Sequence, residues 1–511
     1  MGCGVVHQPN KQNRLSLSVF DGSEHLHPNR DPLNRDLLTL SARHYLAIAL
    51  LKSIVFRPNF PFAPAKFPVF YGWVILVASV LGVMTSIPGQ TIGVSVFTDH
   101  LIEATGLSRL DLSNAYFAGT VTSGCLLPFG GKLLDKLGAR RVVVLAAVGL
   151  GLTLVYLAMC DRLSEWLALR FPITSPTAAA ILLVLGFVSL RFCGQGMLTM
   201  TSRTMLGKWF DRRRGQVSGL IGIFVSFGFA SAPYFFSKGI AAFGWRGLWL
   251  MMAVIVGLGM SSVGWLLFRD NPEICGLRMD GDADSASAEN SAVTTAVNDQ
   301  SAELDTEQKE ESPIWGFTRR EAIGTLTFWA TTLAFASQAL SITGITFHIV
   351  SIGAELGIPE SRMVAIFIPI SIVSTTVGFL VGIACDRVRL QFIFMFMMVG
   401  QAVGISAIAN LNIPGMIIPA TVGLGISGGC FGTLTAVVLP RFFGRLHLGA
   451  ISGVQMMAIV IASAIGPSML ANVQTVTGSY RGGLYACCLF APVVIVLMLI
   501  IQPPERALAS K

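Results

Sequence analysis

The amino-acid sequence predicts an all-α integral membrane protein in which twelve transmembrane helices form two six-helix parallel repeats. Three observations carry this prediction. First, the 511-residue chain is 53% hydrophobic and only 13% charged, so it has too few charges to cover the surface of a soluble protein. Second, apolar segments of about 20 residues, the length that crosses a bilayer core as a helix, recur along most of the chain. Third, motifs of the first six segments return among the last six.

A hydrophilic stretch divides the predicted spans into two sets of six. Residues 271–317 hold eleven acidic and two basic residues. Such a composition buries too little apolar area to fold, so we expect a flexible linker. The predicted spans are residues 71–98, 112–134, 141–160, 178–206, 216–241, 246–268, 323–350, 362–384, 391–410, 413–437, 448–473 and 482–502.

The spans predict five successive parts of the chain. They are a largely disordered N-terminal tail (1–66), a first six-helix bundle (67–270), the acidic linker (271–318), a second six-helix bundle (319–503) and a short C-terminal tail (504–511).

The N-terminal tail is polar and carries charges of both signs. Its first forty residues lack the apolar core of a secretory signal peptide. The start, MGCGVV, has Gly2 but also Val6, where a myristoylation signal has Ser or Thr, so lipidation is not expected. Residues 45–56 are more apolar but contain Lys52 and are too short to span, which predicts a helix lying along the membrane interface.

An internal repeat indicates that the two sets of spans are homologous. WFDRRRGQVSG (209–219) lies 234 positions before FGRLHLGAISG (443–453), and this register aligns Gly215 with Gly449. Two homologous halves in the same orientation are typical of transporters built from parallel repeats.

The distribution of positive charge predicts the orientation in the membrane. Lysine and arginine concentrate in the loops after predicted spans 2, 4, 8 and 10, and such loops stay on the cytoplasmic side. We therefore expect both chain ends and the acidic linker to be cytoplasmic, in a multi-pass protein of the plasma membrane. Although the net charge is +8, no basic stripe interleaved with aromatic residues occurs, so a nucleic-acid partner is not expected.

The segment GGKLLDKLGARR (130–141) places five charges between two spans. We expect Gly131 to let two helices approach closely and Gly138 to permit a sharp turn. Asp135 is suited to pair with a base or to cap the N-terminus of a neighbouring helix. Three bases of the segment are suited to bridge to acidic groups or helix C-termini: Lys136, Arg140 and Arg141.

A partial copy of this segment lies 251 positions later, at Gly382, Asp386 and Arg387. Its presence favours a conformational role, in which the contacts form in one state and break in another. The alternative is a charged hairpin that only sets topology.

The spacing of residues 131–141 resembles the loop signature of the major facilitator superfamily, G-x-x-x-D-[RK]-x-G-x-[RK]-[RK]. The resemblance, together with the twelve-span plan, covers residues 67–503. It implies a transporter whose two halves rock about a central cavity lined by spans 1, 4, 7 and 10.

Five stretches also resemble the monocarboxylate-transporter and oxalate/formate-antiporter branch of that superfamily. Members of the branch commonly carry charges in span 8, and some carry a lysine in span 11. Here neither 363–385 nor 448–470 contains a charge, which argues against a dianion and favours a monoanion or a weak acid carried with its proton. The five stretches are FYGWVILVAS (70–79), LRFCGQGML (190–198), KWFDRRRGQVSGL (208–220), RDNPEICGLRMDG (269–281) and FTRREAIGTLTFW (317–329).

Arg191 is the charged residue that stands out in the middle of a predicted span. Charges at this depth are costly and usually functional. A buried arginine stays protonated, and its forked guanidinium can hold the carboxylate of an anionic substrate. The alternative is an arginine satisfied by carbonyls and amides of neighbouring spans, because the superfamily often has an arginine here without substrate contact.

Further polar residues lie at span depth. The glutamines among them are candidates for substrate binding or for interhelical hydrogen bonds, and the tyrosine for a gate or an aromatic belt. Pro88 and Gly89 are expected to loosen span 1 and free backbone groups. His348, near the outer end of span 7, is a weak candidate for a proton site, with an interfacial histidine as the alternative. The substrate-binding candidates besides Arg191 are Gln195, Gln90, Gln338, Tyr116 and Gln455.

The combined prediction is a secondary active transporter of a small organic anion, a monocarboxylate, working by proton symport or anion exchange. The alternatives are a transporter of a neutral solute and a transporter-like nutrient receptor. An enzyme is not expected, because no nucleophile–base constellation or phosphate-binding loop appears. We expect no cofactor and no metal, and we interpret the nine cysteines as free thiols. The expected partners are a small carboxylate and membrane lipid, and a monomer is sufficient.

Overall fold

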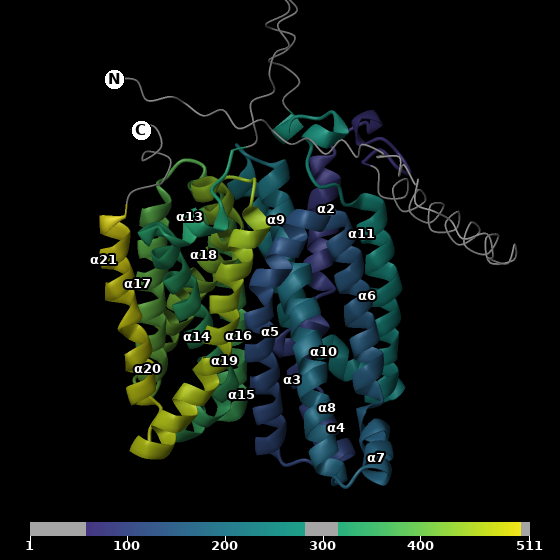
Figure 1. Cartoon of the computed structure of the whole chain (residues 1–511). Helices are drawn as coiled ribbons and strands as arrows, with labels where there is room; N and C mark the ends of the chain where they lie inside the picture. Colours follow the sequence, from purple (N-terminus) through teal and green to yellow (C-terminus); the bar gives the residue numbers. More distant parts are fainter. Residues whose placement is uncertain (1–57, 282–314, 502–511) are drawn as a thin grey trace, which may run out of the picture. The chain divides into compact units, whose positions relative to one another are not determined.

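The computed structural model describes residues 58–281 and 315–501, which belong to one compact unit beginning at Phe56 (Figure 1). Helices make up its regular structure, and the β contact found among these residues is an isolated bridge between Gly316 and Gly444. The predicted interfacial helix at 45–56 and the N-terminal Gly2 lie outside the described residues.

The first half contains the elements of the six predicted spans between residues 71 and 268, with two π-helical stretches, η3 and η4. Its elements are η1 (Pro64–Lys66), α2 (Gly72–Met84), η2 (Ile87–Gly89), α3 (Thr91–Ser95), α4 (Thr98–Thr105), α5 (Arg109–Leu137), α6 (Ala139–Ala158), α7 (Cys160–Arg170), α8 (Ser175–Leu190), η3 (Arg191–Leu198), α9 (Thr199–Trp209), α10 (Arg214–Val254), η4 (Ile255–Met260) and α11 (Ser261–Leu267).

The second half follows the linker and begins with a short capped helix. Its elements are α13 (Arg319–Ile323), α14 (Leu326–Glu355), α15 (Glu360–Ala365), α16 (Phe367–Cys385), α17 (Leu390–Ala409), α18 (Ile417–Phe443), α19 (Leu448–Thr477), α20 (Arg481–Cys488) and α21 (Phe490–Ile500). Before it, the short turns η5 (Glu273–Cys275) and η6 (Met279–Gly281) follow α11.

Nine helical stretches of the described residues are long and apolar enough to cross a membrane. The longest of them, Arg214–Leu267, contains two predicted spans, which part at Gly244 because its φ of 71° interrupts the helix. The shorter apolar helix Gly72–Met84 continues the first span through η2 and α3. With α5 as the second span, this arrangement agrees with the predicted all-helical, twelve-span fold.

Span 1 is broken where the sequence predicts it. The α2 helix ends at Met84, and residues 87–89 form a 3₁₀ turn that ends at Gln90 in an extended conformation (φ −93°, ψ 157°). Pro88 lacks an amide hydrogen and cannot continue the helical hydrogen-bond ladder. The break therefore leaves backbone carbonyl groups that another span has to satisfy.

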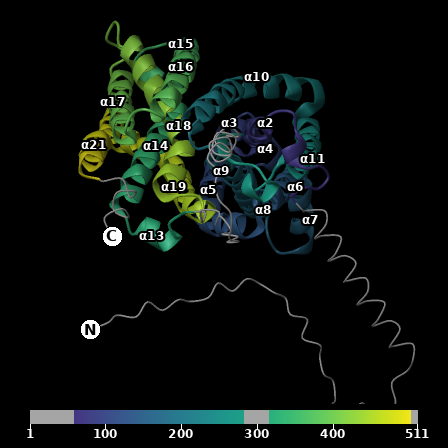
Figure 2. The same ribbon diagram turned by 90° about the horizontal axis from the view of Figure 1, so that it is seen from above.

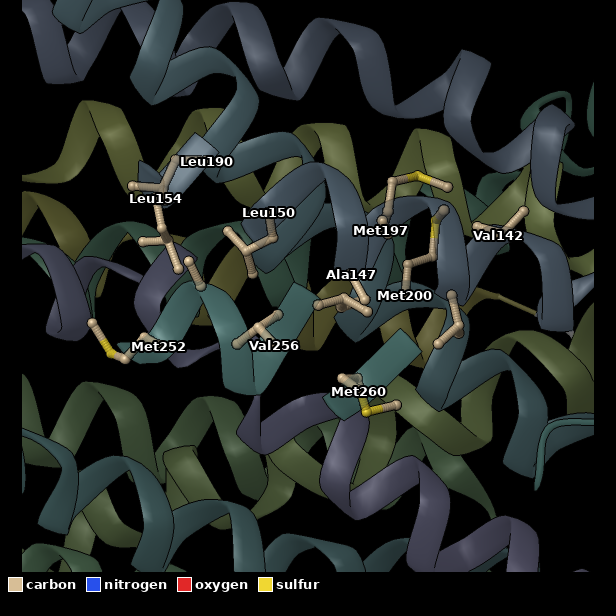
Figure 3. Packing of buried hydrophobic residues seen from close by; sticks show 14 of the residues in the cluster. Val142, Ala147, Leu150, Leu154, Leu190, Met197, Met200, Met252, Val256 and Met260 are labelled. Carbon is tan, nitrogen blue, oxygen red and sulfur yellow. The ribbon is translucent and has the colours of Figure 1, made fainter. Parts of the chain in front are cut away.

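Each half has its own hydrophobic core. In the first half, leucines of α6 face the π-helical stretches of two other spans. Figure 3 shows Leu150 and Leu154 of α6 close to Val256 of η4, with Met197 and Met200 of the fourth span nearby. The second half contains two such clusters, and Val460 of α19 packs into the cluster of the first half.

The halves meet along two helix pairs, α5 with α19 and α10 with α16 (Figure 2). We call the side at which α11 ends and α13 begins the linker side, and the opposite side the far side. The two pairs are equivalent in the repeat. In each pair, the second span of one half packs against the fifth span of the other: α5 and α16 are second spans, and α10 and α19 contain the fifth spans.

Both described ends of the predicted flexible linker make defined contacts. The Asp280 carboxylate accepts hydrogen bonds from the backbone N–H groups of Asp211 (3.0 Å) and Arg212 (2.8 Å) in the turn before α10. At the other end, the N–H of Arg445 donates to the carbonyl of Trp315 at 2.9 Å, in the turn before α19. These two turns are equivalent in the 234-residue repeat, so the linker is attached at the same place in each half.

Candidate functional site

A cavity of about 420 Å³ lies between the two halves. The fourth span lines one side of it through Thr199, Met200, Arg203 and Thr204. These residues share one face of α9 because positions i, i+1, i+4 and i+5 lie together on a helix. The second half contributes residues of α18 and α19, so the cavity changes shape whenever the halves move. Its other polar lining residues are Gln90, Gln195, Ser226, Ser374, Thr435, Ser452 and Gln455.

Arg203 is the one charged residue among the described residues that line this cavity. Its guanidinium donates a hydrogen bond to the hydroxyl of Thr435, on α18 of the other half. Thr435 in turn donates to the Phe431 carbonyl at 2.9 Å. Among the described residues, no charged group compensates Arg203. The cavity therefore contains a positive charge that touches both halves and has donors to spare.

Arg203 was not among the predicted site residues, although the predicted fourth span included it. An arginine close to the end of a span is usually expected to extend its long side chain to the membrane surface. The α9 helix instead continues six residues further, to Trp209, which places Arg203 about 9 Å inside that end at 1.5 Å per residue. A longer predicted fourth span, ending at Trp209, would have placed Arg203 within the membrane and identified it as a candidate.

Three of the six predicted substrate-binding residues line the cavity: Gln90, Gln195 and Gln455. The Gln90 amide donates to the hydroxyls of Ser86 (3.1 Å) and Thr199 (3.2 Å). The carbonyl oxygen of Gln195 has no hydrogen-bond partner among the described residues. This oxygen is itself buried, so the described part of the chain leaves it without an acceptor contact beside the cavity.

Arg191 is 1% exposed and is not among the residues that line the cavity. It donates to the Gly89 carbonyl and to the Thr91 hydroxyl, both at 3.3 Å. Its guanidinium also lies 5.4 Å from the centre of the Tyr116 ring, and the Tyr116 hydroxyl donates to Thr91 at 3.1 Å. Arg191 and Tyr116 therefore surround the break in span 1 and supply a donor for a carbonyl that the break has freed.

Gln338 and His348 lie apart from the cavity lining. Gln338 is buried within α14. The His348 Nε2 lies 2.9 Å from the Pro467 carbonyl oxygen, and its Nδ1 lies 3.4 Å from the Tyr480 hydroxyl. Its partners are thus on α19 and at the start of α20, towards the far side.

Asp135 joins the halves on the linker side. Its carboxylate accepts hydrogen bonds from the N–H groups of Gly449 (2.9 Å) and Ala450 (2.7 Å). These amides are the second and third of α19 and have no partner within their own helix. An anionic group at a helix N-terminus is also favoured by the helix dipole. The predicted capping role of Asp135 is confirmed, and the capped helix belongs to the other half.

Asp386 makes the equivalent contact with the halves exchanged. Its carboxylate accepts from the N–H of Gly215 at 3.1 Å, in the first turn of α10. Its second oxygen has no hydrogen-bond partner among the described residues. Burial raises the pKa of Asp386, and the amide contact opposes that rise. Because Gly215 and Gly449 align in the repeat, one interaction occurs twice with reversed roles.

Glycine permits these contacts. A Cβ on Gly131 would lie 2.1 Å from the Gly449 carbonyl oxygen, and one on Gly215 would lie 2.0 Å from the Gly382 carbonyl oxygen. Real Cβ atoms do not approach this closely, so any side chain would separate the helices. The predicted close approach at Gly131 is confirmed on the linker side.

Most of the predicted switch loop is helical. The turn itself is confined to Gly138, whose φ is 81°. Arg140 is buried and donates to the Phe60 carbonyl at 2.9 Å and to the Trp265 carbonyl near the end of α11, as predicted for a base near a helix C-terminus. The other three bases, Lys136, Arg141 and Arg387, are exposed.

A second hollow, of about 470 Å³, lies between α5 and α8 and is lined by Asp111, Asn114 and Pro176 among others. All of its lining residues belong to the first half. A site for alternating access has to change with the relative position of the halves, so the cavity around Arg203 is the stronger candidate.

Comparison with known proteins agrees with this architecture. Three solved structures are similar. The proton:xylose symporter XylE has 15% sequence identity and a TM-score of 0.56, and the match covers 84% of this chain and 95% of that chain. The human organic anion transporter MFSD10 has 12% identity and a TM-score of 0.55, covering 85% of this chain and 100% of that chain; a bacterial homologue of the iron transporter ferroportin has 14% identity and a TM-score of 0.59, covering 83% and 98%. At these identities the likeness concerns the fold alone. No curated protein matches the chain. A family model, in contrast, matches residues 74–467, most of the chain, and the protein therefore belongs to the Major Facilitator Superfamily.

Proposed function

We propose that this protein is a secondary active transporter of a small organic monoanion, a monocarboxylate, working by alternating access. The observation that carries the choice of substrate is Arg203, an uncompensated cation in the cavity between the halves. A charge in the hydrocarbon region is costly, and a bound anion would offset that cost. A human organic anion transporter, MFSD10, has a similar fold, which supports an organic anion as the substrate class.

The chemistry of Arg203 suits a carboxylate. A guanidinium has five donors in a planar fork that matches the two oxygens of a carboxylate. Hydrogen bonding within the described residues uses this group once, towards Thr435. Two unit charges 4 Å apart at an effective dielectric constant of 20 attract by about 4 kcal/mol, which corresponds to roughly a thousandfold in affinity.

The cavity also bears on coupling. No Asp or Glu is among its described lining residues. In proton symport, the proton would therefore travel on the carboxyl group of the substrate itself. Without proton transport, the positive charge of Arg203 in the empty site would favour exchange of one anion for another. Both modes are consistent with one arginine and a monoanion.

Alternating access would use the duplicated contacts on the linker side. Asp135 and Asp386 hold the two halves together there, so these contacts would have to break for the cavity to open to the linker side. The excess of Lys and Arg on that side supports a cytoplasmic position for it. On this basis we propose that both chain ends are cytoplasmic, and we propose the plasma membrane as the location.

Arg191 has a different part in this proposal. Its hydrogen bonds to Gly89 and Thr91 stabilise the break in span 1. The break directs Gln90 towards the cavity. Arg191 is therefore a positioning residue, and Arg203 is the residue that contacts the substrate.

Counterflow in proteoliposomes with labelled monocarboxylates, dicarboxylates and sugars tests the proposal. We expect a monocarboxylate to exchange, and Arg203→Gln to reduce its exchange more than a hundredfold. Arg389→Gln, an exposed arginine on the linker side, is the matched control and should retain exchange. Undiminished carboxylate exchange by a folded Arg203→Gln variant would refute the assignment of the substrate site.

A neutral solute is the second candidate, favoured by the three glutamines at the cavity, Gln90, Gln195 and Gln455. Amide groups bind hydroxyls well, and XylE, whose fold is similar, is a proton:xylose symporter. The same panel of labelled solutes separates the two candidates, because a transporter of neutral solutes would exchange the sugar and neither carboxylate. A nutrient receptor would show no exchange of any solute.

A further inference from the structure

We infer that the transported anion is amphipathic: a monocarboxylate with a bulky apolar body, bound with its carboxylate towards the linker side. This inference rests on the proposed function and adds the size, polarity and orientation of the substrate. It follows from the volume of the cavity, from where its lining residues lie along their helices, and from an open space beside one glycine.

The volume exceeds what a very small acid can fill. At about 420 Å³, the cavity has the volume of roughly 14 water molecules at about 30 Å³ each. Acetate has four non-hydrogen atoms, so most of the space around it would remain water. Pockets of this size bind ligands of about ten or more non-hydrogen atoms in other proteins.

The charge lies near one end of the cavity. Arg203 is six residues from the linker-side end of α9, and Thr435 is eight residues from the linker-side end of α18. At 1.5 Å per residue these positions are about 9 and 12 Å from the helix ends. Leu439 and Pro440, one turn closer to the linker side, line that end of the cavity. A carboxylate on Arg203 therefore lies at the linker-side end of the bound substrate.

Apolar side chains line the space beyond the charge, together with the polar side chains of Gln195 and Ser226. Phe431 and Ile459 lie about 18 and 17 Å from the linker-side ends of α18 and α19, and Phe229 lies about 22 Å along α10. They come from both halves and all line the cavity. An apolar body extending roughly 5–10 Å from the carboxylate would reach the depth of Phe431 and Ile459 and would be removed from water.

An open space beside Gly432 is part of this apolar region. Gly432 lines the cavity, and a Cβ built on it has no neighbouring atom within 4 Å. A side chain at this position would therefore begin in open space beside the cavity. It would reduce the space for the substrate and keep the guanidinium of Arg203 as the anion-binding group.

Titration calorimetry on the full chain in nanodiscs tests the inference with three probes: 3-phenylpropionate, acetate and the neutral 3-phenylpropanamide. Each buried methylene improves affinity about fourfold, so two to four buried groups predict 3-phenylpropionate to bind about 16- to 250-fold more tightly than acetate. Gly432→Val should weaken 3-phenylpropionate at least tenfold and change acetate less than threefold. Gly222→Val is the matched control, because Gly222 also has no atom within 4 Å of a Cβ but does not line the cavity.

The outcomes separate this inference from the proposed function. Equal binding of acetate and 3-phenylpropionate, or a Gly432→Val variant that weakens both acids alike, would overturn the amphipathic substrate and leave anion transport standing. Equal binding of the amide and the acid would overturn the anion site itself. Failure of all three probes to bind would also reject the inference, because the cavity would then lack the predicted affinity for an apolar acid.

Discussion

Replacing Asp135 by asparagine is expected to loosen the linker-side contact between the halves. The wild-type carboxylate accepts two hydrogen bonds, at 2.9 Å from Gly449 and at 2.7 Å from Ala450. Asparagine has nearly the same shape but carries no charge, and only one of its two terminal atoms can accept. The variant therefore keeps at most one neutral hydrogen bond to α19.

The magnitude follows from the bonds that are lost. A hydrogen bond to a charged group contributes about 1.5–3 kcal/mol, whereas a neutral one contributes about 0.5–1.5 kcal/mol. The charge at the helix N-terminus adds about 0.3–1 kcal/mol. Because the contact is partly buried, we take the lower end of the total, a loss of about 2–3 kcal/mol. That loss corresponds to a roughly 30- to 150-fold increase in the open population.

Hydrogen–deuterium exchange of α19 measures this directly, because the amides of Gly449 and Ala450 are themselves the donors. We expect their exchange to accelerate roughly 30- to 150-fold in Asp135→Asn. Asp386→Asn is the matched control. It should accelerate amide exchange of Gly215 and leave that of Gly449 nearly unchanged. The acceleration should be smaller, because Asp386 accepts one such hydrogen bond. If Asp135→Asn left the exchange of both α19 amides within threefold of wild type, the capping argument would fail.

Three further predictions concern single contacts. Gly131→Leu should separate α5 from α19, because even a Cβ would lie 2.1 Å from the Gly449 carbonyl oxygen. Counterflow in proteoliposomes should fall more than tenfold, and normal activity would contradict the close approach. Asp280→Asn should speed hydrogen–deuterium exchange of the amides in the turn containing Arg212 about tenfold, because it removes the charge that accepts hydrogen bonds from them. Unchanged exchange would show that the linker does not hold this turn. Arg191→Gln should lower the thermal unfolding midpoint by several degrees, because the Gly89 carbonyl loses its donor, while carboxylate affinity of the folded protein changes less than threefold. A tenfold loss of affinity with unchanged stability would instead place Arg191 in the binding site.

The sequence alone was sufficient for the fold class and for the duplication of the charged segment after the second span of each half. Hydropathy and span length predict helices because a bilayer leaves the backbone no other way to satisfy its hydrogen bonds. Residue type and spacing also marked Asp135 as a capping group and Gly131 as a point of close approach. The identity of the capped helix was beyond the sequence, since Gly449 is more than three hundred residues away and belongs to the other half.

The substrate site needed the tertiary structure, as the two arginines of the fourth span show. In a regular α-helix, twelve residues would place Arg191 and Arg203 roughly 120° apart. The π-helical stretch Arg191–Leu198 lies between them and changes their relative orientation by an amount that hydropathy does not record. Packing against the break in span 1 then directs Arg191 to Gly89, and contact with α18 directs Arg203 to the cavity.

The sequence thus determined which residues are polar within the membrane, and only the folded chain decided which of them face a space between the halves. The physical reason is that burial in lipid constrains the composition of each span, whereas the rotation of a span about its axis depends on what it packs against.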